Sequence, residues 1–325
     1  MDGTHHAIAV RQKLSPIRIG KCQKIAVQRL IDCHFLRLVA KAEIHRRTRG
    51  NNACHFLPHK REVPMHDTTS ISRTFDAIAL KEMDPALLAL AVLEAAERAS
   101  ISVEALQQAM NVAALAHIDQ NRKNGIKNPE DPYIVHPLRN VLRLLRYGCV
   151  DADVLAATAL HDTVEDQPRA VIELLSGHPT SEEDQSLLQQ LASQAISNTF
   201  GSRVANIVAA VTNPINDSQD GNAVSYQDHV VAAIEDPAVF LVKFSDFVDN
   251  AGSVKHLGEP TRTRLSAKYA PLVRYFRTGA STLGNQLNLP QYGLDDITHH
   301  LDELEARLPV ESSDPREPES TSTAT

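Results

Sequence analysis

The sequence predicts an all-α protein. Alanine and leucine are abundant, whereas aromatic residues make up only 4% of the 325 residues and tryptophan is absent. Apolar residues recur at intervals of three and four along most of the chain after Asp84, and no segment alternates apolar and polar residues for long. Because this period is typical of helices that bury one face, we expect a helical bundle.

Ten segments carry the helical pattern, and several begin or end at residues that favour helix termini. The first opens with Asp84 and Pro85, an acidic residue and a proline suited to a helix entrance. The second starts from Ser102, an N-cap residue, and is expected to stop at Gly125. The predicted helices are 84–100, 102–125, 136–148, 151–166, 186–200, 202–213, 226–236, 238–254, 261–283 and 294–308.

The breaks between these helices have local causes. Pro129 and Pro132 disfavour helix in the residues before them, so 126–132 is expected to be a loop. Pro290 and Tyr292 separate the last two helices. Residues 309–325 have almost no apolar residues able to pack and are predicted to be a disordered tail.

The segment 1–64 differs in composition from everything after it. It carries 13 Lys and Arg against 4 Asp and Glu, without sustained helical periodicity. Three explanations stay open: translation that begins at Met65 or Met83, a disordered basic arm, or a targeting peptide. Its spacing of cysteines and histidines matches no paired zinc-ligand pattern, the residues being Cys22, Cys33, His34, Cys54, His55 and His59. We therefore treat 1–64 as an extension, 65–83 as a linker and 84–308 as the helical domain.

Charge and composition exclude several classes of function. The net charge is −7, and the region after the basic extension is acidic, which argues against nucleic acid as a partner. No run approaches the roughly 18 apolar residues of a membrane span, so we expect no membrane association. Three of the four cysteines lie in the first sixty residues, which gives no disulfide framework and fits a reducing cytoplasm. A small anionic substrate remains compatible, whereas the oligomeric state is not indicated.

The most informative segment is ALHDTVEDQ, where an apolar helix suddenly carries His161, Asp162, Glu165 and Asp166. Buried ionisable groups are costly unless they are paired, hydrogen-bonded or bound to a metal. In one continuous helix these four side chains would share an arc, since they pair at positions i and i+4. An imidazole beside a carboxylate is a usual ligand set for Zn, Mn or Fe. The alternative is a solvated acidic helix end with a chance histidine.

Two further segments offer ligands for such a site. In YIVHPLRNV, His136 lies between an apolar strip and a proline suited to the first turn of a helix, although a histidine in this setting is often structural. In KFSDFVDN, Asp246 and Asn250 lie one turn apart within an otherwise apolar helix. An aspartate at mid-helix in such surroundings needs a strong partner, and a metal ion is one.

Four ordered blocks in this sequence resemble the hydrolase domain of RelA/SpoT homologues and the small stand-alone HD phosphohydrolases related to it. The blocks are AHIDQNRKNG with PYIVHPL, then ATALHDTVEDQ, then TFGSRVANIVAAVTN, then LVKFSDFVDN with KYAPLVRYF behind it, over roughly residues 110–275. The resemblance implies an HD-domain bundle of about ten helices with one Mn²⁺. It also implies hydrolysis of a small nucleotide, the removal of the 3′-diphosphate from ppGpp and pppGpp.

Carried onto matching positions, the resemblance implies a role for each site residue. His136, His161, Asp162 and Asp246 would be the metal ligands, in agreement with the choice made from the residues alone. Glu165 and Asp166 would position and deprotonate the attacking water. Arg122, Lys123 and Asn250 would contact the substrate, although an ordinary solvated helix end explains the two basic residues nearly as well. His117 would hold the second helix against the site.

Two departures from the RelA/SpoT pattern leave the substrate open. The loop between Arg122 and His136 is about five residues longer, and KFSDFVDN has Phe247 and Asp249 where that family commonly has Arg and His. The alternatives are therefore a phosphohydrolase acting on another nucleotide phosphoester and a non-catalytic module that senses alarmones. Alarmone synthesis is not expected, because only about fifty residues follow the last block.

Overall fold

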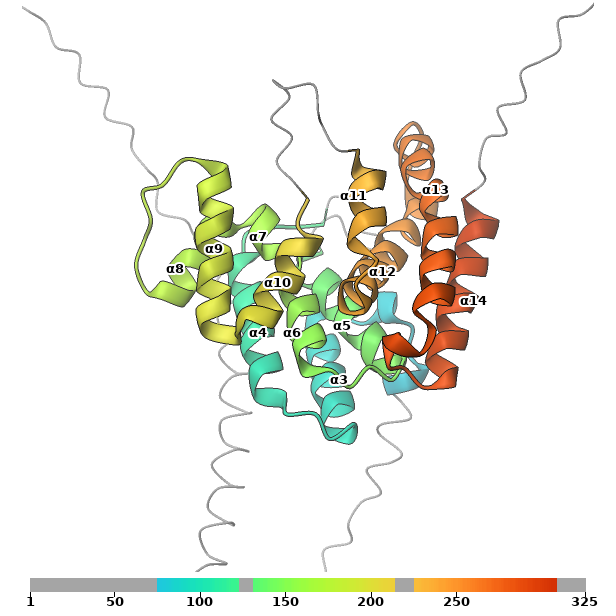
Figure 1. Cartoon of the computed structure of the whole chain (residues 1–325), viewed down its shortest axis with the longest axis horizontal. Helices are drawn as coiled ribbons and strands as arrows, with labels where there is room; N and C mark the ends of the chain where they lie inside the picture. Colours follow the sequence, from blue (N-terminus) through green and yellow to red (C-terminus); the bar gives the residue numbers. More distant parts are fainter. Residues whose placement is uncertain (1–74, 123–130, 214–224, 309–325) are drawn as a thin grey trace, which may run out of the picture. The chain divides into compact units, whose positions relative to one another are not determined.

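Helices dominate the computed structural model of the protein, which describes residues 75–122, 131–213 and 225–308 (Figure 1). Within these ranges there are twelve α-helices, eleven of them of seven residues or more, and no β-strand. The all-α prediction is therefore confirmed. The α-helices are α3 Pro85–Arg98, α4 Val103–Ala116, α5 Val135–Arg146, α6 Ala152–Leu160, α7 Thr163–Asp166, α8 Pro168–Ser176, α9 Gln185–Phe200, α10 Ser202–Val211, α11 Tyr226–Ala233, α12 Pro237–Ala251, α13 Thr261–Leu283 and α14 Gln291–Arg307; the short 3-10 helices are η1 Leu80–Glu82, η2 Val254–His256 and η3 Gly284–Leu287.

Aspartates cap the starts of several helices. Asp84 accepts a hydrogen bond from the backbone N of Leu87 at 2.8 Å, and Pro85 follows it in the first turn. Asp184 and Asp236 accept backbone N–H groups in the same way at α9 and α12. A side-chain oxygen at this position satisfies an N–H group that has no partner within the helix. The starts of these helices are therefore determined by residues next to them in the sequence.

The helices of the structure differ from the predicted ones in several places. The helix expected over 102–125 ends at Ala116, after which the chain turns and Asn121 pairs with Pro132 in an isolated β-bridge. The helix expected over 151–166 divides into α6 and α7, because the backbone at Asp162 (φ −93°, ψ −9°) departs from helical values. A helix at 168–176, α8, was not predicted at all. Tyr292, expected to help break the chain, lies inside α14.

Helix α5 lies at the centre of the packing and positions the site. It contacts α3, α6 and α12. Its apolar side contributes Leu138, Val141 and Leu142 to the core, but its polar side is buried as well. Histidine, asparagine and two arginines on α5 are therefore enclosed by neighbouring helices, and such groups need polar or ionic partners there.

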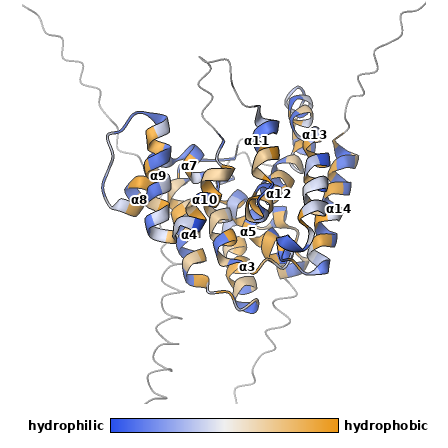
Figure 2. Ribbon diagram, in the orientation of Figure 1, coloured by the Kyte–Doolittle hydropathy of each residue, from blue (hydrophilic) through white to orange (hydrophobic). Residues whose placement is uncertain are grey.

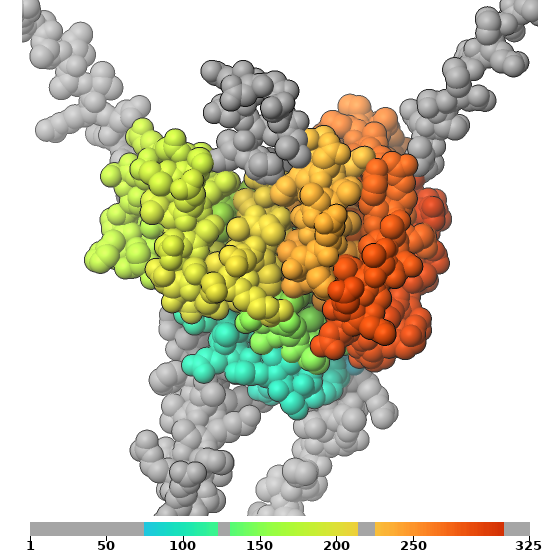
Figure 3. All heavy atoms as spheres, viewed as in Figure 1, coloured from blue at the N-terminus to red at the C-terminus, as the bar shows by residue number. Residues whose placement is uncertain are grey.

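Aromatic packing joins the C-terminal helices to this centre. Phe240 and Phe244 of α12 stack with ring centroids 5.8 Å apart, and both meet Phe276 of α13 edge-on. Figure 2 shows hydrophilic and hydrophobic residues on the same peripheral helices, such as α9 and α14, as expected of helices with one face in a core. In Figure 3 the α8–α9 and α13–α14 regions lie at opposite ends of the viewed face, with α10 and α11 between them. The apolar contacts of α12 fix its polar residues against α5.

The predicted domain boundaries are only partly covered by the described residues. The extension 1–64 and the tail 309–325 lie outside them, so both remain predictions. Residues 80–82, within the predicted linker 65–83, form η1, which contacts α5. Among the helices of the described ranges, none combines the length and the apolar character needed to span a membrane.

Candidate metal centre

The junction between α6 and α7 carries the two residues that the sequence singled out most strongly. Helix α6 is buried from Val154 to Leu160, and His161 follows it directly. The Nδ1 atom of His161 lies 2.8 Å from the carbonyl oxygen of Thr158, which can only accept a hydrogen bond. Nδ1 therefore carries the proton, and Nε2 of His161 is directed toward the neighbouring imidazole and carboxylates.

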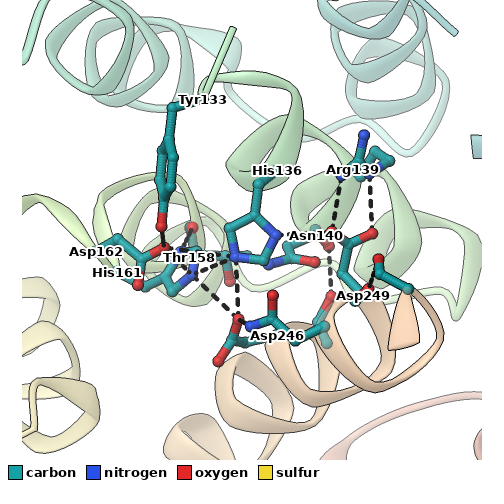
Figure 4. Close-up of polar contacts among 12 residues, drawn as sticks. Tyr133, His136, Arg139, Asn140, Thr158, His161, Asp162, Asp246 and Asp249 are labelled. Atoms are coloured by element: carbon teal, nitrogen blue, oxygen red, sulfur yellow. Dashed lines mark hydrogen bonds and ion pairs between the residues drawn. The ribbon is translucent and has the colours of Figure 1, made fainter. Parts of the chain in front are cut away.

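Four side chains from three parts of the chain converge here, and we call them the His–Asp cluster: His136, His161, Asp162 and Asp246 (Figure 4). The Nε2 atom of His136 lies 3.0 Å from Asp246 Oδ1, 3.2 Å from His161 Nε2 and 3.4 Å from Asp162 Oδ2. His161 Nε2 lies 3.1 Å from Asp162 Oδ2 and 3.7 Å from Asp246 Oδ1. The structure thus brings together all four residues predicted as metal ligands.

The donor set and its spacing fit a metal ion. One ligating atom from each of His136, His161 and Asp162 lies within 4.8 Å of the others, so these three residues could hold an ion. Asp246 Oδ1 adds a fourth donor atom beside both imidazoles. Donors bound about 2.1 Å from one ion lie roughly 3.0–3.5 Å apart, close to the separations found here. Two imidazoles with two carboxylates suit a first-row transition metal.

The histidines and carboxylates of the cluster shift one another's pKa values. Burial would lower the pKa of His161, but the carboxylates of Asp162 and Asp246 outweigh it and hold this pKa well above its usual value. Burial would conversely raise the pKa of Asp162, yet His161 and His136 bring it well below the usual value. The carboxylates therefore stay ionised in a buried place and require a positive partner, either imidazolium groups or a cation.

Glu165 and Asp166 lie in α7, one turn beyond the cluster, but each has a different partner. The carboxylate of Glu165 accepts hydrogen bonds from the backbone N and side-chain Nδ2 of Asn213, at 3.0–3.1 Å. Asp166 Oδ2 accepts from Gln120 Nε2 at 2.8 Å. The expectation that both share one continuous helix with His161 is wrong, because the helix breaks at the cluster. The break instead separates the ligating pair from the two acidic residues that follow.

Two of the three residues predicted to contact substrate lie beside the cluster. Arg122 Nη2 donates to Asn250 Oδ1 at 2.9 Å, and Asn250 Nδ2 donates to Asp246 Oδ1 at 2.6 Å, so both residues border the cluster. The longer loop does not keep Arg122 away, since its backbone N bonds to the carbonyl oxygen of Asp131 just before α5. Lys123 lies outside the described residues.

His117 lies at the end of α4, beside a tyrosine that contacts the cluster. It is 2% exposed, and its ring lies tilted against Tyr133 with ring centroids 4.5 Å apart. Its Nδ1 atom lies 2.7 Å from Gln120 Oε1, and the same glutamine bonds to Asp166. His117 and Gln120 thus connect the end of α4 to α7.

Sequence reasoning missed several residues that surround the cluster. Tyr133 donates through Oη to Asp162 Oδ2 at 2.6 Å. Asp249 is fully buried against arginines of α5 and contacts His136. Asp249 could have been found from the sequence, because it lies in the same apolar helix as Asp246. Tyr133 gave no comparable signal, since tyrosine occurs in many environments.

Comparison with known proteins agrees with this geometry. A family model described as "HD domain" matches residues 109–273, just over half of the chain. The guanosine-3′,5′-bis(diphosphate) 3′-pyrophosphohydrolase of Aquifex aeolicus is 33% identical over 190 residues, covering 57% of this chain and 23% of that protein. The protein of the same name from Vibrio cholerae is 29% identical over 193 residues, covering 57% and 23%.

Two further similarities extend the comparison. The bifunctional (p)ppGpp synthase/hydrolase SpoT of Escherichia coli is 26% identical over 201 residues, covering 58% of this chain and 25% of that protein. A solved structure of a metazoan SpoT orthologue that hydrolyses ppGpp is 20% identical, with a TM-score of 0.38, covering 60% of this chain and 94% of that one. The chain thus spans about a quarter of the length of these curated relatives. It belongs to the HD domain family and is related to the hydrolase domain of the RelA/SpoT enzymes.

Proposed function

We propose that this HD-family phosphohydrolase is a guanosine-3′,5′-bis(diphosphate) 3′-pyrophosphohydrolase, which converts ppGpp or pppGpp to GDP or GTP and pyrophosphate. The observation that carries the proposal is the convergence of the His–Asp cluster, with donor atoms 3.0–3.7 Å apart. The names of the relatives from Aquifex aeolicus and Vibrio cholerae supply the substrate.

The cluster would hold one divalent ion, which we propose to be Mn²⁺, through His136, His161, Asp162 and Asp246. When bound, such an ion lowers the pKa of a coordinated water and offsets negative charge on phosphoryl oxygens. Tyr133 and Asn250 each donate to one of the carboxylates, Asp162 and Asp246 respectively, and thereby hold their orientation. The protein supplies a fixed set of donors, so little rearrangement is needed when substrate arrives.

Glu165 and Asp166 would handle the proton of the attacking water. Hydrolysis replaces the ribose 3′ oxygen on phosphorus by the oxygen of water, so one proton must leave the water and one must reach the departing oxygen. A carboxylate within hydrogen-bond reach of the water can accept the first proton. Asn213 and Gln120 fix these two carboxylates through hydrogen bonds, which supports a positioned rather than a freely rotating pair.

Arg122, Lys123 and Asn250 would contact the substrate. Arg122 lies at the cluster with its guanidinium 5.4 Å from the centre of the Tyr133 ring. A guanidinium can stack on a base or bond to phosphate through two N–H groups. Because Arg122 bonds to Asn250 in this structure, substrate would have to replace that bond or accept from the remaining N–H groups.

Incubating the purified full-length chain with Mn²⁺ and ppGpp, and following GDP and pyrophosphate, tests the proposal. Equal release of both products is the expected result, and a chelator should abolish it. Glu165→Ala should lower turnover by roughly 10²–10⁴-fold while Mn²⁺ binding persists. Asp151→Asn is a suitable control, because Asp151 caps α6 at the end opposite His161.

The assay separates the proposal from its alternatives. If other nucleotide phosphoesters give product and ppGpp gives none, the protein is a hydrolase with a different substrate. Binding of ppGpp without any product would indicate an alarmone-sensing module. Absence of both binding and turnover toward ppGpp would contradict the proposed substrate outright.

A further inference from the structure

Asp249 is a second buried carboxylate, one turn along α12 from the cluster and outside its set of donors. Its side chain is 0% exposed. Arg139 of α5 donates to it through Nε and Nη2, both at 2.9 Å, and Arg143 donates through Nη2 at 3.3 Å. The ammonium of Lys81, from η1, lies 3.6 Å from Asp249 Oδ1 and donates to its backbone carbonyl at 2.8 Å. These three basic side chains surround a single carboxylate.

Two further side chains approach Asp249: Arg122, whose Nη2 lies 3.8 Å from Oδ2, and His136. Asp249 Oδ2 lies 2.7 Å from His136 Nδ1 (Figure 4). A carboxylate surrounded by guanidinium groups is ionised and can only accept hydrogen bonds, so Nδ1 of His136 must be the donor. On the other side of the ring, Nε2 faces Asp246 and His161 at 3.0 and 3.2 Å.

A neighbouring amide is oriented consistently with this proton position. Arg143 Nη1 donates to Asn140 Oδ1 at 2.8 Å, which turns the amide nitrogen of Asn140 toward His136. That nitrogen lies 3.4 Å from His136 Nε2 and can only donate. Asp249 therefore fixes a proton on Nδ1, and the Asn140 amide is oriented as it would be toward an Nε2 lone pair that binds a metal ion.

We infer that Asp249 is a positioning residue for the metal centre: it fixes the tautomer and the ring orientation of His136, so that the Nε2 lone pair is presented to the ion. Arg139, Arg143 and Lys81 act one step further out by holding Asp249 in place. The inference rests on the proposed metal-dependent function. Metal-ligating histidines commonly donate their other N–H to a carboxylate, and loss of that carboxylate typically weakens metal binding by about 10–100-fold.

Mn²⁺ titration of the full chain by calorimetry tests this role. Asp249→Asn alone would leave the surrounding arginines and Lys81 without this counter-charge and could unfold the protein. The informative variant is therefore Asp249→Asn with Arg139→Gln, which exchanges the ion pair for two amides. This double variant should bind Mn²⁺ roughly 10–100-fold more weakly than wild type. Arg139→Gln alone should bind nearly as wild type does, because Asp249 keeps His136, Arg143 and Lys81.

A control shows whether loss of an aspartate–arginine pair as such affects the centre. Asp151 and Arg203 form a pair of similar geometry that does not touch the cluster, with contacts of 2.8 and 2.6 Å. Asp151→Asn should leave Mn²⁺ affinity unchanged. Melting temperatures of all variants would separate lost positioning from lost stability, since Arg139→Gln also removes a buried partner.

Nitrogen-15 spectra of histidine-labelled, metal-free protein give a readout that a purely structural role would not move. His136 should show a hydrogen-bonded Nδ1–H in wild type and in Arg139→Gln, and this signal should be lost or shifted in the double variant. A folded double variant with wild-type Mn²⁺ affinity would overturn the inference and leave the proposed function intact. Wild-type protein that binds no Mn²⁺ would overturn the metal centre, and the inference with it.

Discussion

Two arginine–aspartate pairs in this protein share nearly the same geometry and differ in burial. Arg139 holds Asp249 through two bonds of 2.9 Å, and Arg203 holds Asp151 through bonds of 2.8 and 2.6 Å. The side chains of the first pair are 9% and 0% exposed, whereas those of the second are 51% and 35% exposed. Exposed pairs are screened by water and contribute little to stability.

The buried pair has a different significance. Removing two charges from water costs several kcal/mol for each ion, which their attraction only partly offsets, so a buried pair is a poor way to stabilise a fold. Asp249 also accepts a hydrogen bond from His136, a member of the His–Asp cluster, whereas Asp151 bonds to Arg203 and to the start of α6. An arginine–aspartate pair thus orients the proposed metal ligand His136 in one region, whereas the aspartate of the other pair caps a helix.

Removal of Asp246 should have the largest effect, because it takes a charged donor from the cluster itself. Asp246→Ala is expected to abolish Mn²⁺ retention and, with it, turnover. The measurement is metal analysis of the purified variant, with Asp151→Asn as the control that loses a carboxylate away from the cluster. Full metal occupancy in Asp246→Ala would remove this residue from the ligand set.

Truncation of Asp249 comes next and tests stability directly. Asp249→Ala leaves Arg139 and Arg143 buried, and Lys81 half-buried, without their counter-charge, so the free energy of unfolding should fall by about 3–5 kcal/mol. Urea denaturation of the metal-free protein measures it. A loss below about 1 kcal/mol, the range of exposed pairs, would show that water enters the region and that the contrast in burial has little energetic meaning.

The pH dependence of stability probes the same buried surroundings. Burial, opposed by Asp249, lowers the pKa of Lys81 to about 8 from its ordinary value of 10.5. Between these two pH values the unfolded chain binds one more proton than the native protein, so the free energy of unfolding should rise with pH. Below about pH 8 both states carry the proton, and the contribution is constant. Lys81→Met should lack this rise, on the order of 1–3 kcal/mol, in denaturation curves from about pH 8 to about pH 10.5.

The exposed pair should respond least. Arg203→Ala is expected to change the free energy of unfolding by about 0–1 kcal/mol, and the difference from wild type should shrink as salt is added. Chemical denaturation at low and high ionic strength measures both. A salt-independent loss of several kcal/mol would mean that Arg203 acts through burial, and the two pairs would no longer differ in kind.

Local signals predicted much of the fold. Helix α13 has the predicted bounds, Thr261–Leu283, and α3 begins where Asp84 and Pro85 indicated. The site could be predicted for a related reason, since His136, Asp162 and Asp246 are ionisable residues in apolar segments. Such residues need a partner wherever the chain folds, so their convergence could be expected from the sequence, although their partners were not all identified.

Other features depend on contacts between distant residues. Nothing local ends α4 at Ala116; backbone bonds from Arg122 to Asp131 and from Tyr133 to Gln120 turn the chain there. The division between α6 and α7 has no proline or glycine to cause it, and it occurs where His161 and Asp162 meet other helices. Periodicity reports which face of a helix is buried, but not where tertiary hydrogen bonds interrupt it.

The sequence by itself determined the helical class, most helix entrances and the identity of the residues with metal-ligand chemistry, because period, capping and the cost of burying charge act within short segments. Only the tertiary structure decided that Asp249 bonds to His136, that Glu165 meets Asn213, and that Asp166 meets Gln120. These partners lie 46 to 113 residues apart along the chain. Hydrogen bonds between distant side chains depend on how whole helices pack, which no local pattern records.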